Sequence, residues 1–235
     1  MKIGFAGFYQ LEKRKVLGEA EDGELILGPA EVVAPWFSNL ITDAGLDSQA
    51  GTTTVDQLTF CRLGTGNAAP VAGDTALGAQ GAASSTAGEG EASGWASGNE
   101  YAYRRVSRRF SAGSASGVNL AEVGMGSSSS SSLFSRALLQ DAGGNPITIT
   151  LEHDEVLDVI YELRGYCDLT TSSGTFTING VPTTVTCQAI GWGTNAFLPA
   201  RLGCTIVRNH EQPNVTQNVL AIADSSLDTT VPGPN

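Results

Sequence analysis

Two runs of residues near the middle of the chain alternate apolar and polar side chains. Residues 147–152 have isoleucine or leucine at every second position, and residues 157–163 have leucine, valine and tyrosine in the same pattern. A period of two gives a strand one apolar face, so both runs are predicted to be β-strands. Residues 143–146, Gly-Gly-Asn-Pro, are turn formers, and residues 153–155 are a short polar connection. The pattern therefore predicts an antiparallel pair.

A helix over residues 154–164 is the alternative, because Asp154 could cap it and Gly165 could end it. The run is rich in valine, isoleucine and tyrosine, which favour strands over helices. We therefore predict a strand.

A second hairpin is predicted for residues 174–187. Apolar residues alternate on both sides of Asn179-Gly180, which is the preferred dipeptide of a two-residue type I′ turn. Pro182 has no backbone N–H, which places the return strand at a sheet edge near the turn. Further strands are predicted for residues 58–63, 101–110 and 202–207.

One helix and one long excursion are predicted between these strands. Residues 38–47 contain the helical pattern, with Ser38 or Asn39 as its cap. Residues 67–99 consist mainly of Ala, Gly, Ser and Thr and have too few large apolar side chains for a core of their own. We expect this excursion to wrap a neighbouring subunit.

The two ends differ from the middle of the chain. Residues 1–35 have short apolar groups separated by glycines and are predicted to be an N-terminal arm with short strands. Residues 211–235 contain three prolines and are predicted to be an extended C-terminal arm. Residues 36–210 then form the sandwich domain.

Charge limits the classes of partner. The net charge of −11 argues against nucleic acid or an anionic membrane, since both require a basic face. The 29 glycines and the low charged fraction of 16% favour contacts with other chains over a highly charged monomer surface. No apolar run approaches the roughly 20 residues that span a bilayer, and the apolar start is too short for a signal sequence. We expect a cytosolic product without a membrane partner.

Motifs for catalysis are incomplete. The Gly64-Thr65-Gly66 run lacks the last glycine of a dinucleotide-binding loop. His153, with two acids after it, could bind a metal or act as a general base, but three consecutive residues rarely converge on one ion. The serines at 127–132 lack the elbow of a serine hydrolase and are interpreted as a flexible polar linker. We expect no enzyme, no cofactor and no metal.

The cysteines do not form a disulfide scaffold. Cys61, Cys167, Cys187 and Cys204 are few, widely spaced and without a C-x-x-C pair. We therefore expect these cysteines to be buried free thiols. A bond between Cys167 and Cys187 stays open, because spacing does not establish geometry.

Residues 101–110 carry four of the thirteen basic residues. As a strand, they place Tyr101, Tyr103, Arg105, Ser107 and Arg109 on one face and Ala102, Arg104, Val106, Arg108 and Phe110 on the other. The arginines either form a basic stripe for phosphate or an acidic partner, or neutralise acids within or between subunits. Arginine and aromatic residues are common interface anchors. We predict partner contacts by Trp95, Tyr101, Tyr103, Arg104, Arg105, Arg108 and Arg109.

Several short motifs lie between residues 36 and 166. They are F-S-N-L-I-T-D-A-G-L-D at 37–47, F-C-R-L-G-T-G-N-A-A-P at 60–70, D-T-A-L at 74–77, A-E-V-G-M-G at 121–126, L-F-S-R-A-L at 133–138 and V-I-Y-E-L-R-G-Y at 159–166. This series resembles virion structural proteins of tailed bacteriophages, particularly fibre, collar and other tail-associated components. The resemblance implies a structural protein of the virion, assembled in the cytoplasm of the host bacterium. The chain is short and lacks a repeated shaft, which favours a joining role over a long fibre.

These observations predict an all-β fold, namely an antiparallel, jelly-roll-like β-sandwich with one short helix and long Gly/Ala/Ser-rich loops. The predicted function is a collar, fibre-adaptor or fibre-base role in the tail or neck, with copies of itself and other virion proteins as partners. Two alternatives stay open, a capsid decoration protein and a tail component that binds or depolymerises host surface glycans. Glycan hydrolysis requires two carboxylates about 5 to 10 Å apart, and Glu152 and Glu162 are candidates.

Overall fold

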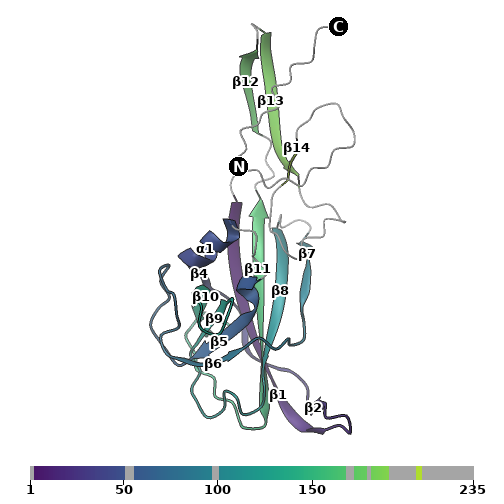
Figure 1. The fold of residues 1–235 in the computed structure, drawn as a ribbon, viewed down its shortest axis with the longest axis vertical. Helices are drawn as coiled ribbons and strands as arrows, with labels where there is room; N and C mark the ends of the chain where they lie inside the picture. Colours follow the sequence, from purple (N-terminus) through teal and green to yellow (C-terminus); the bar gives the residue numbers. More distant parts are fainter. Residues whose placement is uncertain are drawn as a thin grey trace. The chain divides into compact units, whose positions relative to one another are not determined.

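The computed structural model describes residues 3–50, 56–96, 101–167, 172–178, 181–190 and 205–207. The described residues form two compact units, a larger one from Gly4 to Tyr166 and a smaller one that contains Ile3 and the described residues from Cys167 onward (Figure 1). The strand pairs whose register is given below are antiparallel, and the described residues contain a single short α-helix. The predicted all-β, sandwich-like fold is therefore confirmed, whereas the strand order does not confirm a jelly roll.

The first sheet of the larger unit has the order β2-β1-β11-β8-β7, and β3 also pairs with β1. Its strands are β1 (Ile3–Glu19), β2 (Leu25–Leu27), β3 (Glu31–Ser38), β7 (Ala92–Ala96), β8 (Tyr101–Phe110) and β11 (Glu155–Cys167). Strand β1 lies at the centre, with β3 and then β2 along one side and β11 along the other.

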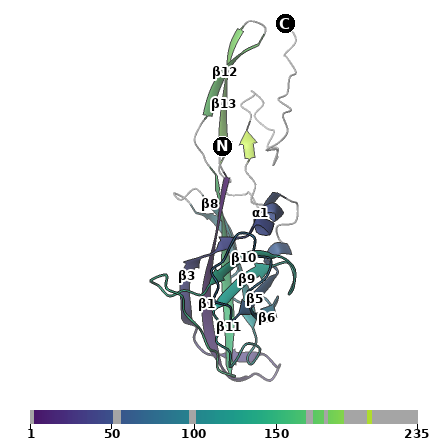
Figure 2. The same ribbon diagram turned by 90° about the vertical axis from the view of Figure 1, so that its left-hand side faces the viewer.

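The second sheet has the order β4-β10-β9-β5-β6. Its strands are β4 (Leu40–Ile41), β5 (Phe60–Gly64), β6 (Gln80–Ser84), β9 (Glu122–Gly126) and β10 (Leu133–Leu138), accompanied by helix α1 (Asp43–Ala50) and the 3₁₀ turn η1 (Asp56–Leu58). Figure 2 shows this sheet as a layer beside the layer of β1, β3 and β11.

The core fills the space between the two layers. Buried apolar side chains come from alternate positions of both sheets, including Tyr9 and Tyr161 from the first and Phe134 from the second. The ring centroids of Tyr9 and Tyr161 are 4.8 Å apart, and those of Phe134 and Tyr161 are 6.3 Å apart with edge-on geometry. Each fully buried side chain of this size contributes about 2 kcal/mol of hydrophobic stabilisation. The core therefore fixes which face of each strand points outward.

The smaller unit contains β12 (Ser172–Ile178), β13 (Val181–Ile190) and β14 (Thr205–Val207). Ile178 pairs with Val181, so the predicted hairpin is confirmed, with Asn179-Gly180 outside the described residues. Strand β14 pairs only with residues 188–190 of β13. The end of β13 that contains Pro182 therefore has one partner among the described strands, as expected.

The predicted pairing of residues 147–152 with residues 157–163 is wrong. The second run is a strand, β11, and the alternative helix is excluded. However, β11 pairs with β8 and β1, and Ile149 and Leu151 form only single bridges, to Leu120 and Ser116. Alternation identifies the buried face of a strand but does not identify its neighbour.

The predicted helix begins at Asp43 instead of near Ser38. Ser38 ends β3, and the Thr42 hydroxyl caps the helix by accepting a hydrogen bond from the Gly45 N–H at 3.0 Å. The Thr42 hydroxyl also donates to the carbonyl of Leu133 in β10. Packing against β10 therefore sets the helix start, in preference to the earlier capping residues.

Residues 1–35 are not an arm, because β1 is a 17-residue strand within the first sheet. The described residues of the excursion, 67–96, belong to the sandwich of their own chain. They contribute β6 to the second sheet and β7 to the first. The expected arm at 211–235 and residues 202–204 lie outside the described residues.

Candidate interaction surface

The outer face of the first sheet carries the candidate site, and the register of β8 with β11 builds it. Val106 and Phe110 point into the core, so the alternate residues of β8 point away from it. On this outer face Tyr103 pairs with Arg164, Arg105 with Glu162 and Arg109 with Asp158.

Two of the predicted contact arginines neutralise acids of β11. Arg109 donates to both oxygens of Asp158 at 2.7 and 2.6 Å, and Arg105 donates twice to Glu162 Oε2 at 3.0 and 2.6 Å. The Asp158 and Glu162 side chains are buried, with 1% and 3% exposure. Hydrogen bonding to Asp158 is the main cause that raises the pKa of Arg109. Intramolecular neutralisation therefore accounts for part of the arginine cluster.

The other two arginines leave the outer face. Arg108 reaches toward the second sheet and donates to the carbonyls of Leu58 and Thr59 at 2.9 and 2.7 Å. Arg104 shares that face of β8, and burial lowers the pKa of its guanidinium. Trp95 belongs to β7, but its side chain lies outside the described residues. The fold thus does not bring the four predicted arginines together.

Residues 86–91, here called the strap, cover the part of the outer face near the C-terminal end of β8. The Gly88 N–H donates to the Ser107 carbonyl at 3.0 Å, and the Arg109 N–H donates to the Thr86 carbonyl at 2.8 Å. Glu89 lies between Arg14 of β1 and Arg109 of β8, at 2.7 and 3.6 Å. The low-complexity excursion therefore docks on its own chain.

The part of the outer face near the N-terminal end of β8 carries alternating rings and guanidinium groups. The Arg105 Cζ atom lies 5.2 Å from the ring centroid of Trp36 and 5.8 Å from that of Tyr103. The Arg164 Cζ atom lies 4.1 Å from the ring of Phe8 and 4.8 Å from that of Tyr101. These six residues, Phe8, Trp36, Tyr101, Tyr103, Arg105 and Arg164, are called the aromatic–arginine platform below.

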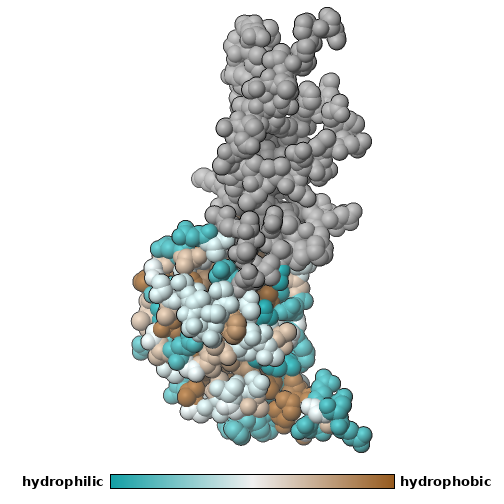
Figure 3. Space-filling model, in the orientation of Figure 1, coloured by the Kyte–Doolittle hydropathy of each residue, from teal (hydrophilic) through white to brown (hydrophobic). Residues whose placement is uncertain are grey.

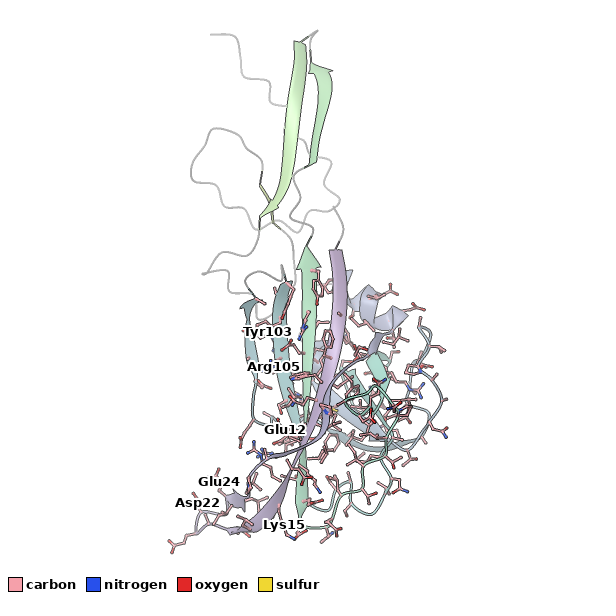
Figure 4. The ribbon with its side chains drawn as sticks, turned by 180° about the vertical axis from the view of Figure 1, so that it is seen from behind. Glu12, Lys15, Asp22, Glu24, Tyr103 and Arg105 are labelled. Atoms are coloured by element: carbon pink, nitrogen blue, oxygen red, sulfur yellow. The ribbon has the colours of Figure 1, made fainter. Side chains whose placement is uncertain are left out.

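The platform side chains lie along the sheet. Strands β1 and β11 separate β3 from β8, a distance of about 14 Å at about 4.8 Å per spacing. Trp36 and Arg105 can only meet across this distance if both side chains lie flat. Trp36 nevertheless remains 39% exposed, and the Arg105 side chain 34%. Figure 4 shows Tyr103 and Arg105 on this face, with Glu12 further along the sheet.

Contacts within the platform hold its side chains in place before any partner arrives. Each cation–π contact of this exposure contributes about 0.5 to 1 kcal/mol. Glu162 also accepts a hydrogen bond from Arg164 Nε at 2.7 Å, so one buried carboxylate orients both platform arginines. A pre-ordered surface loses little side-chain entropy on binding.

Sequence reasoning found Tyr101, Tyr103 and Arg105 but missed Phe8, Trp36 and Arg164. Phe8 lies in β1, within the residues that were expected to form an arm, and Trp36 lies in β3, for which no strand was predicted. Arg164 is the outward-facing partner of Tyr103, which only the β8–β11 register reveals.

A second polar cluster lies in the second sheet and holds the long loop between β5 and β6 by hydrogen bonds. The buried carboxylate of Glu122 accepts hydrogen bonds from the N–H groups of Gly66, Gly78 and Ala79 at 3.0, 3.0 and 2.8 Å. It also accepts two bonds from Arg136, at 3.0 and 2.8 Å. Burial alone would raise the pKa of Glu122, but these donors hold it below its ordinary value.

Asp74 completes this cluster by accepting a bond from Arg136 Nη1 at 2.7 Å. Asp74, Glu122 and Arg136 are called the loop clamp below. Four of the motifs that resemble phage virion proteins, those at 60–70, 74–77, 121–126 and 133–138, meet here. These motifs therefore supply residues that stabilise the fold, and the Glu122 carboxylate accepts its hydrogen bonds from groups of its own chain.

The serine run at 127–132 is an ordered loop and not the flexible linker that was expected. Arg62, which is 1% exposed, donates to the Ser128 carbonyl at 3.0 and 2.6 Å and to Ser131 Oγ at 2.9 Å. Ser128 Oγ in turn accepts the Ser131 N–H at 2.9 Å. The run therefore closes the β9–β10 hairpin over a buried guanidinium.

The candidate pair of glycosidase carboxylates does not form. Glu162 is covered by Arg105 and Arg164, whereas Glu152 lies in the turn before β11 begins at Glu155. Seven strand residues separate Glu155 from Glu162, which corresponds to about 23 Å. This separation exceeds the range that either glycosidase geometry uses.

Within the described parts of the chain, no group of three His, Cys, Asp or Glu residues is arranged to bind a metal ion. No helix in these parts is long and apolar enough to cross a membrane. Cys61 is a buried free thiol, and the side chains of Cys167, Cys187 and Cys204 are outside the described set.

Comparison of the chain with protein-family models, curated proteins and solved structures finds no match in any of the three. Functional inference therefore starts from the platform and from the sequence resemblance.

Proposed function

We propose that this chain is a non-enzymatic structural component of a tailed-bacteriophage virion. It acts in the tail or neck as a collar, fibre-adaptor or fibre-base protein and assembles with copies of itself and with other virion proteins. The aromatic–arginine platform is the observation that carries this proposal. Flat, pre-ordered surfaces rich in Trp, Tyr and Arg are typical of protein interfaces.

The placement of the phage-like motifs supports the same proposal. The motifs at 60–70, 121–126 and 133–138 form β5, β9 and β10, and the loop clamp joins them. A rigid second sheet then backs the first sheet, whose outer face bears the platform. Such a scaffold suits a protein whose task is to hold neighbours at fixed positions.

The test uses a platform variant and a matched surface control. The variant is Trp36→Ala with Tyr103→Ala, which truncates one exposed and one half-buried ring of the platform and removes no side-chain hydrogen bond described here. The control is Val118→Ala, because Val118 is 41% exposed and lies away from the platform strands. Light scattering of full-length protein and quantitation in purified particles measure assembly.

We expect wild type and the Val118 control to form a defined oligomer and to enter particles. The platform variant should lose both, because truncated anchors typically cost 2 kcal/mol or more each, roughly 30-fold in affinity. Equal oligomerisation and incorporation by all three proteins would show that the platform is not the assembly surface.

Glycan binding is a second candidate because an exposed ring, Trp36, lies flat on a polar sheet face. Sugars stack on such rings, and the platform offers guanidinium groups beside them. Retention of wild type, but not of Trp36→Ala, on immobilised host-surface glycans would support this function. If neither protein binds, the glycan-binding candidate is wrong, and assembly is the only function that we propose.

A further inference from the structure

A two-stranded finger extends beyond the first sheet. The β1–β3 pairing ends at Lys13 with Glu31, and at Val16 the N–H of β1 donates to the Asp154 carbonyl at 2.7 Å, just before β11 begins. Residues 17–27, called the finger below, pair with each other, except that Leu27 pairs with Val16 (Figures 1 and 4).

The finger exposes large apolar side chains. Leu17, Leu25 and Ile26 are 65%, 43% and 49% exposed. An irregularity in the β1–β2 register leaves both Leu17 and Gly18 opposite Ile26. Gly18 and Gly28 provide space beneath Ile26 and Leu17, respectively. Figure 3 shows apolar surface beside the hydrophilic tip of this finger.

The finger tip is acidic. Glu19, Glu21, Asp22 and Glu24 surround a turn in which Asp22 Oδ1 accepts the Glu24 N–H at 3.1 Å. The nearest cation along the chain, Lys15, already pairs with Asp154 at 3.0 Å. A complementary surface must therefore combine apolar area with unneutralised positive charge.

The platform has this combination. Arg105 and Arg164 share one buried carboxylate, that of Glu162, and lie among four aromatic rings. On the same sheet, Arg14, Arg108 and Arg109 form ion pairs with acids of the strap and of β11. Arg104 forms no ion pair among the described residues, but it lies on the other face of β8. Among the surfaces described above, the platform is thus the one where guanidinium groups outnumber their carboxylate partners.

We infer that the finger of one copy docks on the aromatic–arginine platform of the next copy. This inference rests on the proposed function, because it specifies how the chain self-associates. The finger cannot reach the platform of its own chain by folding back. Phe8 and Leu17 are nine residues apart along the same strand, which is about 30 Å.

Two different surfaces meet in this contact, so it is heterologous. Such contacts form a closed ring when the rotation between neighbours closes and an open chain when it does not. A ring agrees with the collar role proposed above, and acid–arginine contact predicts weaker association at high salt.

The test uses two loss-of-contact variants and their mixture. The finger variant is Glu21→Lys with Glu24→Lys, and it keeps Asp22 because that carboxylate holds the turn. The platform variant is Trp36→Ala with Tyr103→Ala. Each full-length variant alone is expected to be a monomer, whereas the equimolar mixture should form dimers and nothing larger. In the mixture, the intact finger of one variant meets the intact platform of the other.

Other outcomes separate the inference from the proposed function. If only the platform variant loses assembly, the inference is wrong and the proposed function stands. If both variants are monomeric and their mixture stays monomeric, finger and platform do not pair, and the inference is wrong. If both variants assemble as wild type does, the inference is wrong and the platform is not the assembly surface. A wild-type monomer that still enters particles would overturn the inference alone.

Discussion

Replacement of Glu122 by alanine should destabilise the larger unit strongly. The carboxylate accepts five hydrogen bonds, three from backbone N–H groups of the β5–β6 loop and two from Arg136. Glu122→Ala leaves three amides unpaired and removes one of the two carboxylates that neutralise a guanidinium whose side chain is 3% exposed.

The magnitude follows from these contacts. Removal of one member of a buried ion pair typically costs about 3 to 5 kcal/mol. Asp74 still neutralises Arg136, at 2.7 Å, so we expect the lower end, about 3 kcal/mol. At about 2 to 4 °C per kcal/mol for a chain of this size, the melting temperature should fall by roughly 6 to 12 °C. Glu122→Gln should cost less, because its carbonyl oxygen still accepts hydrogen bonds.

Urea unfolding of the full chain measures the free energy, and hydrogen exchange at Gly66, Gly78 and Ala79 measures the loop directly. Glu24→Ala is the matched control, because it removes an exposed glutamate and should change stability by less than about 0.5 kcal/mol. Formate should recover part of the loss in Glu122→Ala by binding the vacated donors, whereas chloride at equal ionic strength should recover less. A loss below about 1 kcal/mol with unchanged amide protection would refute this reasoning.

Three further predictions concern the same unit. Gly45→Ala should destabilise the fold by about 1 to 3 kcal/mol in urea unfolding, although alanine favours helices, because its Cβ would overlap the Phe134 carbonyl; Gly73→Ala, in open space, should be nearly neutral. Cys61 should resist alkylation until the protein unfolds, as peptide mass mapping would show, because burial raises the pKa of its thiol and excludes the reagent. Both acids of the loop clamp have lowered pKa values, because hydrogen-bond donors outweigh the effect of burial. The stabilisation by these two carboxylates is therefore full above the unfolded pKa of about 4 and should be lost as the pH falls through the folded pKa values. Unfolding curves measured from pH 6 to pH 2 test this dependence. A clamp contribution that grew on acidification would contradict the assigned sign.

Strands with a clear period of two were predictable from sequence. Strand β8 has the predicted bounds, and β5 and the β12–β13 hairpin fall where alternation and Asn179-Gly180 placed them. Local side-chain pattern and turn chemistry decide such elements.

Strand neighbours and helix bounds were not predictable, because tertiary contacts decide them. The prediction joined β11 to residues 147–152, whereas β8 and β1 are its neighbours in the sheet. Helix α1 starts where Thr42 meets β10, although Ser38 also has a capping side chain. Strand β1 was missed because glycines and charged residues interrupt its apolar pattern, and pairing on both sides stabilises it nevertheless.

The candidate site was half predictable for the same reason. Composition within residues 101–110 identified Tyr103 and Arg105, because those side chains belong to one strand. Their partners Trp36 and Arg164 come from other strands, and no pattern in the sequence links them.

Several of the short motifs lie in the second sheet and its loops, whereas the motif at 159–166 lies in β11 of the first sheet and contains the platform residue Arg164. Motif residues such as Glu122 and Arg136 make contacts within the chain, so they determine how the second sheet is built. In the proposed assembly, partner choice depends instead on exposed side chains such as Trp36 and on the finger. Variants of the exposed platform and finger side chains, rather than of the loop clamp, are therefore the ones that test the proposed contacts.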